Sequence, residues 1–172
     1  MEILTYPNEA LRNKAEAIDM EDSEFMKYIH CVATDMQLTM LGSNGIGLAS
    51  TQVGIPYRIF AFDSNIFEKV IVLANPKITF SDGEVVEEEA CLSIPGYSAR
   101  VKRSLLVQVE WDDISTGNHR DDWFSGRDAR VIQHELDHLD GILYIDHLGP
   151  LKRRMFEKRY AKLQKQGRIP KY

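Results

Sequence analysis

The sequence has little cysteine, with only Cys31 and Cys91 among 172 residues. A pair this sparse cannot build the disulfide framework of a small secreted protein, so both thiols are free to do chemistry. The chain also lacks an apolar run long enough to cross a bilayer, and residues 1–22 lack the basic flank and apolar stretch of a signal peptide. These absences predict a soluble, cytoplasmic protein without a membrane partner.

Length and hydrophobic periodicity predict one α+β domain over residues 1–172. The chain is 44% hydrophobic, enough for one core, and it has no repeats or low-complexity linker. Between Ser23 and Leu41, apolar residues recur at three- and four-residue steps, as in an amphipathic helix. Residues 57–111 instead carry short β-branched and aromatic runs separated by turns, which predict mostly antiparallel strands. We expect a further short strand at WFS, residues 123–125, and a helix that follows Gly126 and stops near Gly141. We also expect a last helix whose apolar face holds Leu151, Met155, Phe156, Tyr160 and Leu163.

The segment RVIQHELDHLDG, residues 130–141, contains an HExxH motif. On a helix, residues i and i+4 lie one above the other, so His134 and His138 can present both imidazoles to one metal ion. Glu135 lies about 100 degrees further round, where it can reach a metal-bound water without being a ligand. This layout is typical of metal-assisted hydrolysis, and a charged helix face without a metal is the competing interpretation.

Two histidines do not complete a metal site, and the third ligand separates the enzyme classes. A metzincin-type peptidase requires a histidine where Tyr144 stands, which excludes that class. A thermolysin-like peptidase would take a glutamate from a later helix, for which Glu157 is the candidate. Cys91, in EEEACLSIPG, is the other candidate, because a thiolate with two imidazoles leaves one position open for water. The competing interpretation of Cys91 is a small core residue.

The segment GIGLASTQ, residues 45–52, is rich in glycine and ends in an amide side chain, that of Gln52. No Lys-Ser or Lys-Thr pair follows it, so nucleotide binding has no support. The segment offers close backbone approach to a ligand and one donor, Gln52, of the kind that stabilises an oxyanion. A helix stop followed by a tight turn is the competing interpretation.

Taken together, GIGLASTQ, EACLS and QHELDHLDG closely resemble, in this order and spacing, the three signature motifs of the peptide deformylase family. The likeness covers nearly the whole chain, from ILTYPNEALR through QVGIPYRIF and ANP to IDHLGPLKR. The resemblance implies removal of the formyl group from N-formylmethionine of nascent polypeptides, with release of formate. It also implies the fold of that family, in which antiparallel sheets surround a central HExxH metal-binding helix, with helices at both ends of the chain.

The resemblance also implies a role for each matching residue. Cys91, His134 and His138 are the implied metal ligands, and Glu135 is the implied general base. The oxyanion would be held by the metal, the Gln52 side-chain amide and the backbone N–H of Leu92. Fe(II) is the implied working metal, with Zn(II), Ni(II) or Co(II) able to occupy the site.

Further positions would bind substrate or support the ligands. The implied substrate-binding residues are Gly45, Ile46, Gly47, Ala90 and Arg127. Gly47 would let the substrate backbone approach. Glu89 and Asp137 are candidates for contacts with the ligands, with Arg103 and Arg130 as ion partners. A solvated or purely structural role for these four is the alternative.

Four positions depart from the family pattern. One is Ser50, a small change that adds a hydroxyl where the first motif usually carries alanine. Ala90 replaces a glycine beside the cysteine ligand. Ser98 stands where the family often has a substrate-holding arginine, for which Arg100 is a candidate substitute. Arg127 replaces a bulky apolar residue at the rim of the methionine pocket, where its methylenes would cover the pocket and its charge would draw acidic groups. We therefore expect an altered preference downstream of the formylmethionine, with the chemistry intact.

The C-terminal residues 151–172 are strongly basic, with nine Lys or Arg against one acidic residue, although the whole chain carries a net charge of -5. Ribosome contact and a solvated helix face are both open interpretations of this tail. A non-enzyme alternative is a deformylase-like module that binds formylated or otherwise N-terminally acylated peptides, although every residue needed for the chemistry is present. The expected state is a monomer in the cytoplasm of a bacterium, or a viral protein in a bacterial host, with an organelle less favoured.

Overall fold

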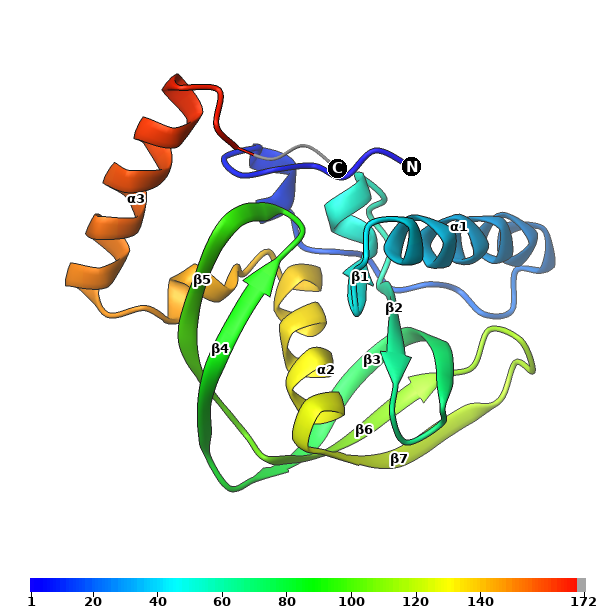
Figure 1. The fold of residues 1–172 in the computed structure, drawn as a ribbon. Helices are drawn as coiled ribbons and strands as arrows, with labels where there is room; N and C mark the ends of the chain where they lie inside the picture. The colour runs from blue at the N-terminus through cyan, green and yellow to red at the C-terminus, as the bar shows by residue number, and fades with distance from the viewer. Residues whose placement is uncertain (170–172) are drawn as a thin grey trace.

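The computed structural model describes residues 1–169 as two antiparallel sheets and three α-helices, with one helix at the centre (Figure 1). The helices are Ser23–Gly42 (α1), Gly126–Leu139 (α2) and Pro150–Lys165 (α3). The strands are Gly47–Ala49 (β1), Ile59–Ser64 (β2), Lys69–Asp82 (β3), Val85–Cys91 (β4), Ile94–Arg103 (β5), Leu106–Asp112 (β6) and His119–Ser125 (β7). Short 3-10 turns lie at Glu9–Arg12 (η1), Ser50–Val53 (η2) and Tyr144–His147 (η3). The expected α+β fold with antiparallel sheets around the HExxH helix is confirmed.

The larger sheet has the strand order β1-β2-β3-β6-β7, and every neighbouring pair in it is antiparallel. Strand β2 is buried along nearly its whole length, because α2 covers one face of the sheet and α1 covers the other. Double burial explains why its sequence, IFAF, is continuously apolar rather than alternating. Strand β1 is an edge of this sheet.

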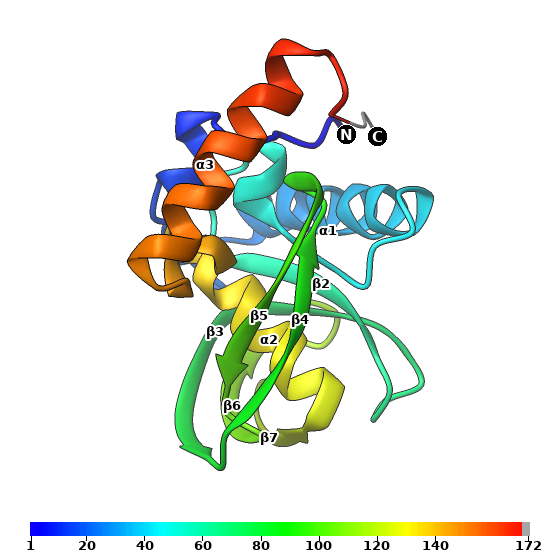
Figure 2. The ribbon, with the colours of Figure 1, turned by 60° about the vertical axis from the view of Figure 1, so that its left-hand side comes forward.

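The central helix α2 packs on the large sheet through the apolar residues Val131, Ile132, Leu136 and Leu139. The hairpin of β4 and β5 covers another side of α2 (Figures 1 and 2). Arg130 of α2 fastens the hairpin, because its guanidinium donates to the Val101 carbonyl at 3.2 Å and to the Val85 carbonyl at 3.1 Å. The site motifs on β4 and α2 are therefore held face to face.

Helix α1 begins where the Asp22 carboxylate accepts the backbone N–H groups of Glu24 and Phe25, which satisfies two otherwise free donors. Its buried face packs on the side of the large sheet opposite α2. That face consists of Ile29, Val32, Ala33, Met36 and Met40. The predicted N-terminal helix is confirmed and extends to Gly42.

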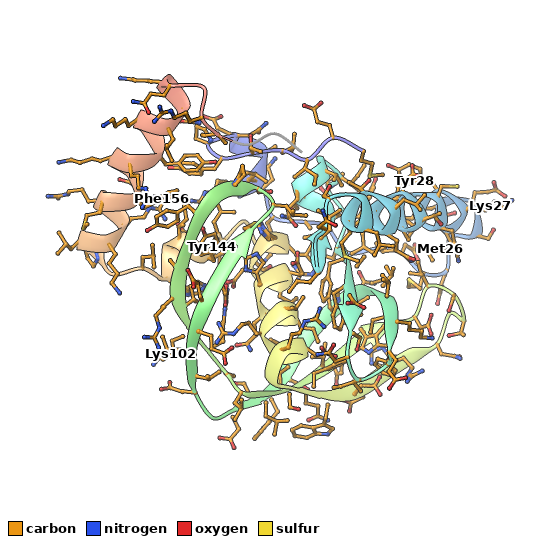
Figure 3. All side chains as sticks on the ribbon, in the orientation of Figure 1. Met26, Lys27, Tyr28, Lys102, Tyr144 and Phe156 are labelled. Carbon is orange, nitrogen blue, oxygen red and sulfur yellow. The ribbon has the colours of Figure 1, made fainter. Side chains whose placement is uncertain are left out.

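Helix α3 starts with Pro150, a residue suited to the first helical position, and packs through Phe156 and Tyr160 alone as its buried residues. Phe156 points toward β5 (Figure 3), and its ring centroid lies 4.7 Å from that of Tyr97. Leu151 and Met155 are 73% and 63% exposed, so the predicted five-residue apolar face is wrong at these two positions. The helix rests on the domain along a narrow aromatic seam.

Several strands were not predicted with these bounds. Strands β2, β3 and β6 lie where apolar runs predicted them, and β7 is longer than the expected WFS. The hairpin of β4 and β5 and the short strand β1 were not identified from the sequence. Over residues 1–169, the structure has no helix of the length and apolarity that a bilayer crossing requires.

Candidate metal centre

Cys91, His134 and His138 meet at one point. Cys91 ends β4, and the two histidines lie one turn apart on α2. One ligand atom from each residue lies within 4.8 Å of the other two, and all three residues are buried. The Cys91 Sγ and His138 Nε2 atoms are 3.1 Å apart. The fold thus brings together the three predicted ligands, which come from two motifs that are distant in the sequence.

The His134 ring is oriented by the groups around it. Its Nδ1 lies 3.0 Å from Glu89 Oε2, and because a carboxylate only accepts, Nδ1 carries the proton and Nε2 faces the site. The Tyr144 ring stacks on His134 with centroids 5.9 Å apart. Glu89 is itself held by Arg103 at 2.9 Å and Arg130 at 2.7 Å. This support leaves the imidazole little rotational freedom.

The pKa values in the site follow from burial and these contacts. Burial would raise the pKa of Glu89, but hydrogen bonds with His134 and Arg103 hold it far below its usual range. Burial lowers the pKa of His138 well below its ordinary value, which keeps this ring in the neutral form that binds metals. Burial would also lower the pKa of His134, but hydrogen bonds with Cys91 and Glu89 raise it. A proton on the ligand nitrogen of His134 must therefore leave when a cation binds.

Glu135 is buried beside the two histidines, and its Oε2 atom has no hydrogen-bond partner within the described chain. Burial raises its pKa to about 7, against the opposing effect of nearby His134. A carboxylate of this kind is matched to accepting and returning a proton near neutral pH. A Cβ atom added to Gly47 would lie 2.3 Å from Glu135 Oε1, so the glycine makes room for this carboxylate. The structure therefore explains this glycine by the space that Glu135 needs, whereas the sequence led us to expect a glycine that lets the substrate backbone approach.

Gln52 is fixed at both ends of its amide. Its Oε1 accepts the Ala49 N–H at 2.8 Å, and its Nε2 donates to Ser93 Oγ at 3.1 Å. The same Nε2 lies 3.5 Å from Cys91 Sγ, which places a preorganised donor next to the metal-ligand cluster. Leu92 directly follows Cys91 and lines the cavity of about 530 Å³ that opens at the metal-ligand cluster. The two donors expected from the sequence are therefore both at the site.

A cavity of about 530 Å³ opens beside this cluster. All five predicted substrate-binding residues line it, and they are Gly45, Ile46, Gly47, Ala90 and Arg127. Its walls include α2, β5, β4 and the segment leading into β1. Strands β1 and β4 are each an edge of their sheet. An extended peptide can lie between two such edges and hydrogen-bond with both.

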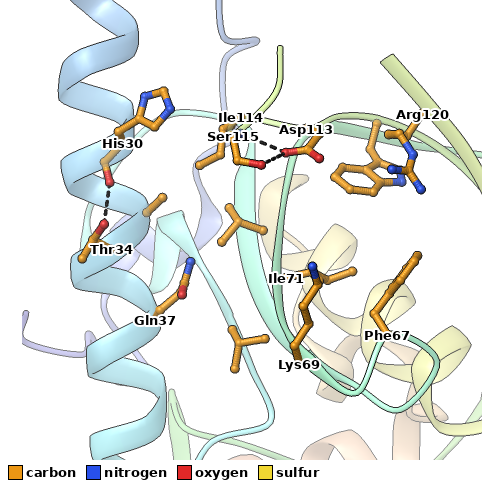
Figure 4. Close-up of a pocket in the computed structure, with 14 residues that line it drawn as sticks. His30, Thr34, Gln37, Phe67, Lys69, Ile71, Asp113, Ile114, Ser115 and Arg120 are labelled. Atoms are coloured by element: carbon orange, nitrogen blue, oxygen red, sulfur yellow. Dashed lines mark hydrogen bonds between the residues drawn. The ribbon is translucent and has the colours of Figure 1, made fainter. Parts of the chain in front are cut away.

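A second hollow of about 300 Å³ lies between α1 and the large sheet, with His30, Lys69 and Arg120 among its lining residues (Figure 4). Asp113 lines it too, but its carboxylate already accepts the backbone N–H and the hydroxyl of Ser115. The metal-ligand cluster is not in this hollow, so the cavity of about 530 Å³ is the one at which the chemistry converges.

Arg127 and Ser98, which depart from the family pattern, both have hydrogen-bond partners within the protein. The Arg127 guanidinium donates to the Asp63 carbonyl at 3.0 Å and to Asn65 Oδ1 at 2.7 Å, and it pairs with the Asp63 carboxylate at 3.3 Å. Its charge is therefore engaged by Asp63 at the end of β2 and by Asn65 just after it. Ser98 bonds Glu88, and Arg100 donates to the Val86 carbonyl at 3.0 Å rather than lining the cavity.

Glu157, the peptidase alternative, lies on α3 and pairs with Arg153 at 2.8 Å. It does not join the cluster of possible metal-holding groups found among residues 1–169. The structure therefore favours Cys91 as the third ligand over Glu157.

Sequence reasoning missed several residues that support the site. Ser93 anchors the Gln52 amide, and Thr51 donates from its hydroxyl to the His138 carbonyl at 3.0 Å. His147 lies 2.7 Å from Asp137 Oδ2. Thr51 and Ser93 lie within the motifs GIGLASTQ and EACLS, but their bonding partners are 87 and 41 residues away, so spacing carried no signal for these contacts. His147 lies outside the three motifs.

The donor set fits a divalent transition-metal ion. One thiol and two imidazoles are borderline-soft ligands that suit Fe(II), Co(II), Ni(II) or Zn(II) and leave a coordination position for a reactant. The orphaned Oε2 of Glu135 is a buried acceptor that a water molecule or substrate at that position would satisfy. The arrangement can therefore activate water against a polarised carbonyl group.

Comparisons with known proteins place this site in a family. The profile described as Polypeptide deformylase matches residues 1–154. Peptide deformylase from Thermodesulfovibrio yellowstonii is 44% identical over 163 residues, which cover 93% of this chain and 96% of that protein. The crystal structure of peptide deformylase from Thermus thermophilus is 36% identical, with a TM-score of 0.82 over 96% of this chain and 98% of that one. A peptide deformylase structure from Legionella pneumophila, 35% identical, gives a TM-score of 0.83 over 98% of both chains.

Proposed function

We propose roles for individual residues from the premise that this chain belongs to the polypeptide deformylase family, whose metal-dependent enzymes remove the formyl group from nascent polypeptides. Cys91, His134 and His138 are the proposed metal ligands, and Glu135 is the proposed general base. The observation that carries the proposal is the convergence of the three ligand atoms within 4.8 Å, next to a buried carboxylate with a free oxygen.

A divalent cation held by these ligands would supply Lewis acidity, lowering the pKa of water and withdrawing electrons from the formyl oxygen. Glu135 takes a proton from the water that attacks the formyl carbon. The Gln52 amide and the Leu92 N–H donate to the formyl oxygen as it gains negative charge. Glu135 then returns the proton to the leaving amine as the carbon–nitrogen bond breaks. The products are formate and a peptide with a free amino terminus.

The cavity binds the substrate as an extended chain between β4 and the segment that leads into β1. Its lining combines apolar side chains, among them Ile46, Leu92 and Val131, with the backbone of the glycine segment. Apolar burial favours the methionine side chain, and the edge strands hold the backbone. Arg127 contributes its methylenes to the wall while its guanidinium stays bonded to Asp63 at the end of β2.

Formate release from an N-formyl-Met tripeptide tests this proposal. Anaerobically purified, Fe(II)-loaded protein should release formate, and Glu135→Ala should lose turnover while it keeps its metal. The peptidase alternative requires Cys91→Ser to retain the metal and cleave an internal peptide bond. The binding-module alternative requires the wild-type protein to bind the formyl peptide without releasing formate. Either of the last two outcomes would reject the assignment.

Fe(II) is the proposed working metal, with Zn(II), Ni(II) and Co(II) as ions that also fit the N₂S donor set. Ligand chemistry does not separate them, since affinity order and cellular supply both intervene. Loading the metal-free protein anaerobically with each ion and comparing formate release per bound ion tests the choice. A higher rate with Zn(II) than with Fe(II) would overturn it.

We place the enzyme in the cytoplasm of a bacterium, as a monomer acting on nascent chains. The proposal is supported by bacterial relatives such as that of Thermodesulfovibrio yellowstonii. Helix α3 supports ribosome contact, because its exposed side carries Lys158, Arg159, Lys162 and Lys165. Lys171, also counted in the basic tail, lies outside the described residues.

A further inference from the structure

We propose that His147 is a positioning residue for the metal ligand His134, although it lies outside the cavity and touches neither metal ligands nor substrate-binding groups. It acts through Asp137, Arg103 and Glu89, which connect η3 to the His134 ring. The inference rests on the ligand assignment proposed above and extends it to a residue on another element.

An unbroken series of hydrogen bonds connects His147 to His134. His147 Nε2 lies 2.7 Å from Asp137 Oδ2, and Arg103 Nη1 donates to the same oxygen at 2.6 Å. Arg103 then donates to both oxygens of Glu89, from Nε at 2.9 Å and from Nη2 at 3.1 Å. Glu89 Oε2 accepts from His134 Nδ1 at 3.0 Å. Four hydrogen-bonded steps thus lead from His147 to His134.

Because most of this network is buried, the loss of one hydrogen bond affects the positions of the other members. The side chains of Arg103, Glu89 and His134 are 5%, 4% and 10% exposed, so water does not readily replace a lost partner. The two-pronged contact between Arg103 and Glu89 fixes their relative geometry. Asp137 sets the position of Arg103, and the structure gives Asp137 Oδ2 one further partner, His147. Removal of His147 therefore loosens the carboxylate on which Arg103 is anchored.

The proton on His147 can be placed from the same contacts. Its Nε2 is also 3.3 Å from Arg103 Nη1, but both groups cannot donate to each other. The shorter contact to Asp137 decides the assignment, because the carboxylate only accepts and Nε2 must donate. A neutral amide donor at the same place can substitute for this bond, which makes glutamine the conservative replacement.

The η3 turn supports His134 by a second route. Tyr144, three residues before His147, stacks on the His134 ring, and its hydroxyl donates to the Tyr97 carbonyl at 2.9 Å. Asp146 between them is bonded by Arg12 and Arg153, which ties the turn to η1 and α3. The turn is thus held rigidly enough for a hydrogen bond at its end to affect a ligand on α2.

The experiment uses the full chain loaded with Co(II), whose visible absorption reports ligand geometry, and measures the rate of Co(II) loss to a chelator. The variants are His147→Ala and His147→Gln. The matched control is His119→Ala, which removes another surface histidine paired with an aspartate, Asp112 at 2.9 Å, far from the metal ligands. Melting temperatures are recorded for each, and His147 is 36% exposed, so its replacement should leave the fold intact.

We expect His147→Ala to lose Co(II) roughly three to ten times faster than wild type and to shift the visible bands, since partners of metal ligands tune affinity. His147→Gln should restore both properties, and His119→Ala should match wild type. Wild-type Co(II) retention in His147→Ala, or a faster loss that His147→Gln does not restore, would overturn the inference. If wild type itself bound no Co(II), the ligand assignment would fail first, and the inference with it.

Discussion

At the scale of single residues, the position of the Glu135 carboxylate depends on Gly47 having no side chain. Glu135 is buried, and its Oε1 occupies the space that a Cβ on Gly47 would need. Its other oxygen is left free for a reactant. The absence of a side chain at Gly47 therefore sets the position of the base.

Gly47→Ala should lower kcat for formate release by about 100-fold, because an ångström of misplacement in a catalytic group has an effect of that order. The displaced atom belongs to the end of a side chain, so the melting temperature and bound metal should stay close to wild type. Gly42→Ala is the control, since a Cβ there meets nothing within 4 Å. Full activity in Gly47→Ala would show that Glu135 has more room than the structure gives it.

Arg127 should not select substrates by charge, contrary to what its position in the sequence suggested. Its guanidinium already bonds Asp63 and Asn65, so an acidic substrate gains little from it. We expect Arg127→Met to leave the ratio of kcat/KM for substrates with acidic and basic second residues unchanged within about twofold, as exposed ion pairs contribute little. A tenfold change in that ratio would restore the charge-selection hypothesis.

At the residue scale, the motifs predicted which side chains the structure brings together at the site, Cys91, His134, His138 and Glu135, but not the residues that support them. HExxH on one helix is a local pattern, and a match to EACLS identified Cys91. The positions of Arg103 and His147 relative to Glu89 depend on how β5 and η3 pack on α2. No local pattern encodes that packing, so the network behind His134 required the structure.

At the scale of elements, the site is assembled by the packing of the β4 and β5 hairpin on α2. Arg130 and Glu89 hold this interface, with Glu89 Oε1 accepting from Arg130 Nη1 at 2.7 Å. The hairpin escaped sequence reasoning because β4 reads VVEEEAC, and its run of glutamates lacks the alternation of a half-buried strand. Glu89 is the buried member of that run, and its burial is explained by its arginine partners rather than by polarity.

Asp146 joins three elements, since it bonds Arg12 of η1, Arg153 of α3 and the Leu143 N–H within its own turn. Burial would raise its pKa, but these hydrogen bonds lower it. A lowered folded-state pKa means that the stabilisation is present above the ordinary value of 3.8 and is lost as the pH falls through the folded-state pKa.

Asp146→Asn should therefore lower the free energy of unfolding by roughly 1–2 kcal/mol near neutral pH, as expected for hydrogen bonds to charged groups. The difference from wild type should shrink as the pH falls below 3.8. Urea titrations near neutral pH and below pH 3.8 measure the two free energies of unfolding. Glu157→Gln is the control, because it removes an exposed ion pair of the same Arg153. A difference that is the same at both pH values would show that the charge of Asp146 is not involved.

At the scale of the whole molecule, the charge is divided between an acidic body and a basic end. Helix α3 packs on the domain through the buried Phe156 and Tyr160 and pairs with it through Arg153, whereas Lys158, Arg159, Lys162 and Lys165 stay exposed. Leu151 and Met155 are exposed as well. A helix with so narrow a seam is free to present its basic side to a phosphate surface. The sequence predicted the charge of this helix but not which of its apolar residues would be buried.

The double variant Lys158→Glu and Lys162→Glu should weaken co-sedimentation with ribosomes and reduce its dependence on salt, since each lost phosphate contact lowers the salt slope by about one. Formate release from a short peptide should not change, because both residues lie on α3, away from the cavity. Deletion of the residues after Leu163 should act in the same direction. Co-sedimentation that is unaffected by salt and by these changes would leave α3 a solvated helix face.

The central claim is that a thiolate from β4 and two imidazoles from α2 bind one metal ion. The most direct measurement is the near-ultraviolet sulfur-to-cobalt charge-transfer band of the Co(II)-loaded protein. Wild type should show this band with one ion per chain, Glu135→Ala should keep it, and Cys91→Ser should lose it together with formate release. A band that is missing from wild type, or a Cys91→Ser protein that binds metal and releases formate normally, would contradict the account.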